Sequence, residues 1–189
     1  MIVIGGSLGG MRAVRTILSA LPPVFPDVIA VVLHRHREGN DSLVELLRKG
    51  SPLPISEAVD KEPICAGCVY LAPPDYHLLV ERKNFSLSTD EPVQYARPSI
   101  DVLFESAADA FGPAVLGVVL TGANHDGARG AARIEERGGR VAVQDPATAE
   151  SPAMPLAAQE VTRRPHVCTL EKMADLLLQW SAAQPPGIS

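Results

Sequence analysis

A serine flanked by glycines lies near the amino terminus of this chain of 189 residues. Gly5-Gly-Ser-Leu-Gly9 fits the pattern G-x-S-x-G, in which a sharp turn between a strand and a helix exposes a serine hydroxyl. A helix that begins after Ser7 would direct free N–H groups and its positive dipole end toward the turn, which favours an oxyanion. Ser7 is therefore a candidate nucleophile, although glycine-rich turns also bind phosphates.

A histidine after the second apolar run is the candidate general base. Val28-Ile-Ala-Val-Val-Leu33 is typical of a strand buried on both faces of a parallel sheet, and His34 follows it directly. Because adjacent parallel strands end at the same sheet edge, a neutral His34 can accept the proton of Ser7. His36 competes for this role, and weaker candidates are His77, His125 and His166.

An aspartate follows a third buried-strand candidate at residues 114–120. In the loop at 121–127, Asp126 can hold the imidazole tautomer and stabilise the imidazolium, and it equally suits a turn or a helix N-cap. The competitors Asp101 and Asp145 are explained by a helix dipole and by a turn before proline. The chain order Ser, His, Asp differs from that of the α/β-hydrolases and disfavours that superfamily.

A nucleotide site of the Rossmann type is an alternative for the same turn. The dinucleotide fingerprint requires glycine at its first, third and sixth positions, where this chain has Gly5, Ser7 and Gly10. The second strand ends in His34 instead of an acid that would bind a ribose, and no lysine follows Gly10 as in a Walker A loop. The pattern therefore disfavours a bound nucleotide.

The pair Cys65-Ala-Gly-Cys68 has the spacing of a redox dithiol or of half a zinc site. It precedes the strand-like residues 69–71, and only Cys168 remains to supply another thiolate. We therefore expect a turn before a strand, with no metal and no catalytic role for either cysteine.

Apolar periodicity and breakers predict alternating strands and helices. This alternation indicates an α/β fold, a doubly wound and mostly parallel sheet with helices on both faces and a β-hairpin excursion. Residues 1–183 are expected to form one domain and 184–189 a frayed tail. The expected strands are 2–5, 28–33, 69–71, 114–120 and 140–144, with a hairpin at 78–88. The expected helices are 9–21, one that Asn40 or Asp41 caps and that Gly50 and Pro52 terminate, 99–111 with Ser99 as its N-cap, 128–137 and 171–180, with a proline-rich turn after 144.

Composition excludes several classes of protein. Hydrophobic residues make up 46% and charged residues 21%, with a net charge of -5, so the chain has the balance of a globular domain and no basic patch for nucleic acid. No apolar run reaches membrane-spanning length, and the amino terminus lacks the pattern of a secretory signal. We expect a cytoplasmic protein.

Five ordered segments over residues 2–180 resemble the catalytic domain of the chemotaxis receptor methylesterases. The resemblance implies a triad of Ser7, His34 and Asp126, with the backbone N–H groups of Leu8 and Ala123 as oxyanion donors. It also implies hydrolysis of γ-glutamyl methyl esters on chemoreceptor helices and deamidation of receptor glutamine, without metal or cofactor. The segments are Val3–Gly10, His34 after its strand, Tyr70–His77, Arg97–Phe104 and Leu120–Ala128.

The chain departs from the family pattern around the expected oxyanion site. Leu8 and Ala123 stand where the family usually has Thr and Met, and Ala123-Asn-His125 stands where it favours Met-Gly-Asn. Main-chain donors tolerate such changes, but the pocket wall and the loop before Asp126 are altered. Arg35, Arg37 and Arg97 either complement an acidic receptor helix or are ordinary surface charges.

Members of the family often carry an amino-terminal receiver domain whose phosphorylation relieves inhibition, whereas this chain starts at the first strand. We therefore expect no receiver domain and activity without phosphorylation. A catalytically idle module that binds receptors or a signalling partner is the other class of function that the sequence leaves open. The sequence does not specify an oligomeric state.

Overall fold

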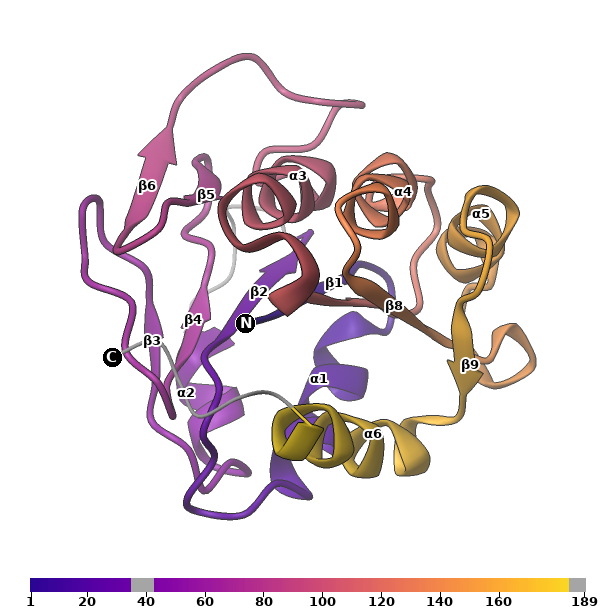
Figure 1. The fold of residues 1–189 in the computed structure, drawn as a ribbon, viewed down its shortest axis with the longest axis horizontal. Coiled ribbons are helices and arrows are strands. Elements are labelled where there is room, and N and C mark those ends of the chain that lie inside the picture. The colour runs from indigo at the N-terminus through magenta and orange to yellow at the C-terminus, as the bar shows by residue number, and fades with distance from the viewer. Residues whose placement is uncertain (35–42, 184–189) are drawn as a thin grey trace.

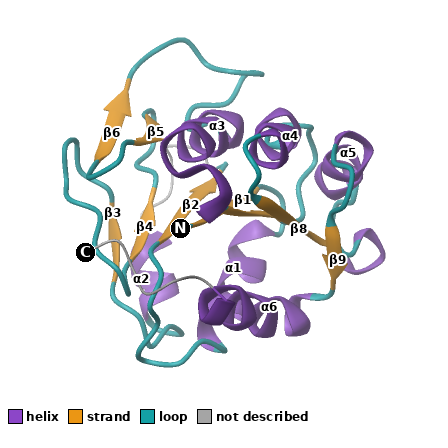
Figure 2. Cartoon of the chain, in the orientation of Figure 1, coloured by secondary structure: helices purple, strands orange, loops and turns teal. Residues whose placement is uncertain are grey.

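The computed structural model describes residues 1–34 and 43–183, and most of its elements follow the expected alternation (Figures 1 and 2). One-turn 3₁₀ helices lie at Gly112–Ala114 and Pro146–Thr148. The strands are β1 (Ile2–Gly6), β2 (Ile29–Leu33), β3 (Ile55–Glu57), β4 (Val69–Leu71), β5 (His77–Val80), β6 (Phe85–Ser88), β7 (Leu116–Val119), β8 (Arg140–Gln144) and β9 (His166–Cys168). The helices are α1 (Gly10–Ser19), α2 (Leu43–Arg48), α3 (Ile100–Phe111), α4 (Ala128–Glu136), α5 (Ala153–Val161) and α6 (Leu170–Ala183).

Within residues 1–34 and 43–183, the main sheet has seven strands in the order β3-β4-β2-β1-β7-β8-β9, and each neighbouring pair is parallel. Strands β5 and β6 form a separate antiparallel hairpin, with His77 opposite Ser88. The chain moves outward from β1 in one direction and then returns to place β7 on its other side. The carboxyl ends of β2, β1 and β7 therefore meet at the switch point where α/β sheets bind their ligands. The predicted fold class is confirmed.

Helices cover both faces of the sheet: α1, α2 and α6 lie on one face, and α3, α4 and α5 on the other (Figure 1). Successive strand residues point to opposite faces, so Ile4 packs toward α1 while Val3 packs toward α3. Both side chains are fully buried. Burial of one such aliphatic side chain stabilises the fold by about 1.5–3 kcal/mol, and β2 is buried along its whole length in the same way.

The amino end of α3 reaches the carboxyl end of β1 because two glycines make room for Ile100. A Cβ on Gly5 would lie 2.3 Å from Ile100 Cγ2, and a Cβ on Gly127 would lie 2.7 Å from the same atom. Gly127 also has a φ of 97°, a left-handed conformation that favours glycine. This close packing brings the N–H groups of the first turn of α3, which have no acceptor within their own helix, to the carboxyl edge of the sheet.

Three elements differ from the sequence prediction. Helix α5 occupies part of the segment expected to be a proline-rich turn, because Pro152 is its N-cap and Pro155 lies in its first turn, where a missing N–H breaks no intrahelical bond. Strands β3 and β9, three residues each, were also missed. The expected cap of α2 at Asn40 or Asp41 and the expected frayed tail lie outside the described residues. In residues 1–34 and 43–183, no helix is both long and apolar enough to cross a membrane.

Candidate active site

Three loops meet at the carboxyl edge of the sheet. Ser7 follows β1, and its N–H donates to the carbonyl of Thr121 at 2.9 Å, which joins it to the loop after β7. His34 follows β2, and its N–H donates to the carbonyl of Gly6 at 3.1 Å. The backbone therefore holds Ser7, His34 and the 121–127 loop side by side, as the sequence predicted.

The serine turn exposes backbone donors. Gly9 has a φ of 78° and is the N-cap of α1, and the N–H of Gly10 closes the turn on the Ser7 carbonyl at 2.8 Å. Gly122 passes so close that a Cβ there would lie 3.0 Å from Ser7 Cβ. Among the described residues, the N–H groups of Leu8 and Ala123 donate no hydrogen bond. Leu8 follows Ser7 and Ala123 follows Gly122, so these two N–H groups belong to the two segments that meet at Ser7, which is compatible with an oxyanion site.

His34 is hydrogen-bonded to Asp126, as the sequence predicted. The His34 Nε2 atom lies 2.8 Å from Asp126 Oδ2, with 14% of the His34 side chain and none of the Asp126 side chain exposed. Oδ2 also accepts from Ile100 N–H at 2.7 Å, while Oδ1 accepts from Asp101 N–H at 3.0 Å and from the Ser99 hydroxyl at 2.9 Å. Asp126 therefore joins the His34 ring to the first turn of α3.

Asp101 of α3 binds the start of α4 in the way that Asp126 binds the start of α3. Its Oδ1 atom accepts from the N–H groups of Gly127 at 2.9 Å and Gly130 at 2.8 Å, and its Oδ2 atom accepts from Gln94 Nε2 at 3.1 Å. The carboxylate next to α4 thus binds N–H groups of α3, and the carboxylate of α3 binds N–H groups of α4. Asp101 lies in the first turn of α3 as predicted, but the dipole of that helix is not the whole explanation, because its fully buried carboxylate also caps the neighbouring helix.

These two buried carboxylates have opposite pKa shifts. Burial tends to raise the pKa of Asp126, but the hydrogen bonds from His34, Asp101 N–H and Ile100 N–H outweigh it and the pKa is lowered. Burial also raises the pKa of Asp101; the bond from Gly130 N–H opposes this, the Asp126 charge adds to it, and the pKa remains raised. Asp126 is therefore the carboxylate whose surroundings favour the negative charge that an imidazolium needs.

Asn124 is a site residue that the sequence prediction missed. Its Oδ1 atom accepts from Asp126 N–H at 3.2 Å, and its Nδ2 atom lies 3.1 Å from His34 Nδ1. The first contact is a local turn that the spacing Asn-x-Asp indicates. The second joins residues 90 positions apart, so no local pattern reports it.

A second supporting group, His77, lies behind the triad and was expected only as a weak candidate for the general base. His77 is buried, its Nδ1 accepts from Ser99 N–H at 3.2 Å, and its Nε2 lies 3.2 Å from the carbonyl of Glu91. Ser99 is the N-cap of α3, as predicted, and also donates its hydroxyl to Asp126. His77 therefore supports the residue that supports Asp126, and it does not reach the serine turn through any hydrogen bond of the described chain.

The remaining predicted candidates lie elsewhere. His36, Arg35 and Arg37 fall outside the described residues. Arg97 donates to the carbonyls of Thr89 at 2.9 Å and Asp90 at 3.1 Å. His125 is exposed, and His166 is the first residue of β9, the outermost strand on one side of the sheet.

The cysteine pair has the local structure that the sequence predicted. Cys65 and Cys68 are free thiols on either side of a turn at Ala66–Gly67, immediately before β4. In the described ranges, no group of three or more His, Cys, Asp or Glu side chains is placed to hold a metal ion.

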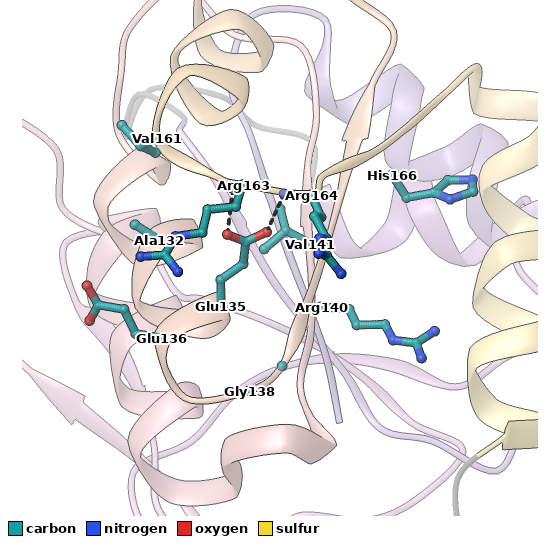
Figure 3. A pocket seen from close by; sticks show the side chains of 11 residues that line it. Ala132, Glu135, Glu136, Gly138, Arg140, Val141, Val161, Arg163, Arg164 and His166 are labelled. Atoms are coloured by element: carbon teal, nitrogen blue, oxygen red, sulfur yellow. Dashed lines mark hydrogen bonds between the residues drawn. The ribbon is translucent and has the colours of Figure 1, made fainter.

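A groove of about 940 Å³ lies away from these residues, at the amino ends of β8 and β9 (Figure 3). Arg140, Arg163, Arg164 and His166 line it together with Glu135, which accepts from the N–H groups of Arg163 at 2.7 Å and Arg164 at 3.0 Å. Neither the serine turn nor the His–Asp pair contributes to its walls. The chemistry at the carboxyl edge, and not the size of this groove, therefore locates the candidate active site.

The fold and the site together define a class. A doubly wound α/β domain that places a serine turn, a histidine and a buried aspartate at the carboxyl edge of its sheet has the architecture of a serine hydrolase. The family model described as CheB methylesterase matches residues 2–177. The chain belongs to this family.

Relatives and a solved structure agree with this membership. A protein from Leptospira interrogans is 48% identical over 179 residues, which cover 94% of this chain and 93% of that protein. A protein-glutamate methylesterase/protein-glutamine glutaminase of Hahella chejuensis is 37% identical over 98% of this chain and 52% of its own length. The crystal structure of the Thermotoga maritima CheB methylesterase catalytic domain superposes with a TM-score of 0.90 at 32% identity, covering 94% of this chain and 96% of that one. The chain thus spans nearly all of one relative and about half of another.

Proposed function

We propose that this chain hydrolyses γ-glutamyl methyl esters on methylated chemoreceptor helices and also deamidates receptor glutamine. The observation that carries the proposal is the 2.8 Å hydrogen bond between His34 Nε2 and the buried Asp126, next to the turn that exposes Ser7. The relatives named protein-glutamate methylesterase/protein-glutamine glutaminase support the same pair of substrates. The proposed place of action is the cytoplasm, beside the signalling helices of the receptor.

The proposed reaction begins with attack of Ser7 Oγ on the ester carbonyl carbon. The serine proton passes to His34 Nδ1, because Nε2 carries the proton that binds Asp126. The Leu8 and Ala123 N–H groups stabilise the oxyanion. His34 then protonates the departing methoxide, methanol leaves, and an acyl-enzyme remains on Ser7.

The second half of the reaction repeats these roles with water. His34 Nδ1 takes a proton from the water that attacks the acyl carbon, the bond to Ser7 Oγ breaks, and the proton returns to the serine. The product is a glutamate side chain. With receptor glutamine as the substrate, ammonia leaves in place of methanol.

The test is release of labelled methanol from receptor membranes that carry methyl-labelled glutamyl esters. We expect the wild-type chain to release methanol and Ser7→Ala to release none, with both proteins folded by circular dichroism. Sedimentation of the wild-type chain with receptor membranes without methanol release would instead support an idle binding module. Thermal stabilisation by a nucleotide would support the Rossmann-type alternative.

A further inference from the structure

Both nitrogens of the His34 ring are bound by residues of one loop. Asp126 Oδ2 lies 2.8 Å from Nε2, and Asn124 Nδ2 lies 3.1 Å from Nδ1. The orientation of the Asn124 amide follows from its other contact, because Oδ1 accepts from Asp126 N–H at 3.2 Å and Nδ2 is then the atom that faces the ring. The 121–127 loop therefore holds the imidazole from two sides.

The protonation of the ring follows from these partners. An ionised carboxylate only accepts hydrogen bonds and an amide nitrogen only donates them, so the proton lies on Nε2 and the lone pair lies on Nδ1. Asn124 donates to that lone pair. In the described part of the chain the Ser7 hydroxyl makes no hydrogen bond. In the proposed mechanism Nδ1 accepts the serine proton, and in this structure Asn124 is hydrogen-bonded to that atom.

We infer that Asn124 is a positioning residue that selects the Nε2–H tautomer of His34 and occupies its Nδ1 lone pair in the free enzyme. This inference rests on the proposed function, in which Ser7 is the nucleophile and His34 its base. When Ser7 attacks, its O–H bond breaks, the proton moves to Nδ1, and the hydrogen bond from Asn124 must break. Asn124 thus keeps the base from accepting the serine proton until a substrate at the site displaces this hydrogen bond.

The test uses a fluorophosphonate probe, which reports nucleophile activation without a receptor. Ser7 Oγ forms a bond to phosphorus, fluoride leaves, and His34 takes the serine proton. Loss of one hydrogen bond that competes for the base corresponds to a labelling rate about two- to tenfold higher in Asn124→Ala than in the wild type. The matched control is His125→Ala, an exposed neighbour in the same loop, which should label at the wild-type rate.

A second variant separates the tautomer from the restraint. Asn124→Asp keeps an oxygen for Asp126 N–H but replaces the donor by an acceptor, which favours a proton on Nδ1 and removes the lone pair. We expect its labelling to be at least about tenfold slower than that of the wild type, as for other losses of the correct tautomer. This variant keeps the loop contact, so it remains decisive if Asn124→Ala folds poorly.

Nitrogen-15 spectra of His34 give a readout that a merely structural residue would not change. In Asn124→Ala the Nδ1 resonance should shift while the Nε2 resonance, still bound to Asp126, stays in place. Equal labelling of all Asn124 variants, slower labelling of a folded Asn124→Ala, or an unchanged Nδ1 resonance would each overturn the inference. Labelling that follows this pattern without any methanol release would instead contradict the proposed substrate and leave the role of Asn124 intact. If no variant and no wild-type protein is labelled at Ser7, the nucleophile and this inference are both wrong.

Discussion

Replacing Asp126 by asparagine should damage folding as well as catalysis. In the wild type, each carboxylate oxygen accepts two hydrogen bonds, one of them from a backbone N–H of α3. The amide of Asp126→Asn places its NH₂ group where one of these oxygens was. Whichever way it turns, it faces a backbone donor, Ile100 N–H or Asp101 N–H, and leaves that donor unsatisfied.

The size of this effect can be estimated from the bonds. An unsatisfied buried N–H costs about 1–3 kcal/mol, and each of the two bonds that the amide oxygen still accepts weakens by about 1 kcal/mol when the acceptor loses its charge. The fourth bond can survive only with its direction reversed, because the NH₂ group donates. Relief of the desolvation of the buried charge offsets part of the loss, but the lowered pKa of Asp126 shows that the hydrogen bonds outweigh burial. We expect a net loss of about 2–4 kcal/mol, or a Tm lower by about 4–16 °C for a chain of this size.

Catalysis should fall much further than stability. An amide that turns its NH₂ group toward His34 Nε2 forces the proton onto Nδ1, and the wrong tautomer in a comparable triad lowers turnover by about 10⁴. Thermal melting by circular dichroism measures the stability and identifies a temperature at which the variant is folded, and fluorophosphonate labelling at that temperature measures the loss of activity.

The matched control for Asp126→Asn is Asp101→Asn. Its amide can keep Oδ1 on the N–H groups of Gly127 and Gly130, while Nδ2 requires the Gln94 amide to turn its oxygen toward it and loses the ion pair with Arg129 Nε at 3.9 Å. We expect labelling near the wild-type rate and stability within about 1 kcal/mol of the wild type. A wild-type Tm for Asp126→Asn, or equal damage by the two substitutions, would refute the assignment of Asp126.

The other predictions concern the unit of catalysis, pH and the cysteine pair. Ser7→Ala and His34→Ala should each lower turnover at least as much as Asp126→Asn, and the double variant should be no worse than either, because the residues act as a unit; additive losses in methanol release would contradict this. The raised pKa of Asp101 means that ionising this group destabilises the fold, so the wild type should lose stability relative to Asp101→Asn as the pH rises above the ordinary value of 3.8. The lowered pKa of Asp126 means that its ionised form stabilises the fold, and this stabilisation should disappear as the pH falls below 3.8. Urea titrations at several pH values measure both trends. A difference in stability between the wild type and Asp101→Asn that does not change with pH would argue against the first trend. The double variant Cys65→Ser with Cys68→Ser should release methanol at the wild-type rate, and an inactive but folded protein would show that the pair has a catalytic role.

Much of the fold could be predicted because its central strands are long β-branched runs. β1 and β2 are buried on both faces, so almost every residue in them carries the signal. Strands β3 and β9 have only three residues each and present too little pattern to be distinguished from loops. Helix α5 was hidden by Pro152 and Pro155, which are helix breakers everywhere except in a first turn.

The contact between His34 and Asp126 could be predicted from topology alone, because both follow strands that end at one sheet edge. What topology does not report is which further groups share those atoms. The bonds from Asp126 to the first turn of α3 depend on how closely Ile100 packs against Gly5, and the contact of Asn124 depends on a side-chain orientation. Residues far apart in sequence meet there with no periodic pattern to indicate it.

The exchange of carboxylates between α3 and α4 affects how variation at this position should be interpreted. Asp126 fastens the start of α3 whether or not a reaction takes place, so selection for folding alone would retain it. A relative that had lost its serine and its histidine, and with them any hydrolysis, would still be expected to keep this aspartate. The presence of this aspartate in a relative is therefore evidence of the fold and not of activity, and only the residues at the positions of Ser7 and His34 distinguish an active enzyme from an inactive relative.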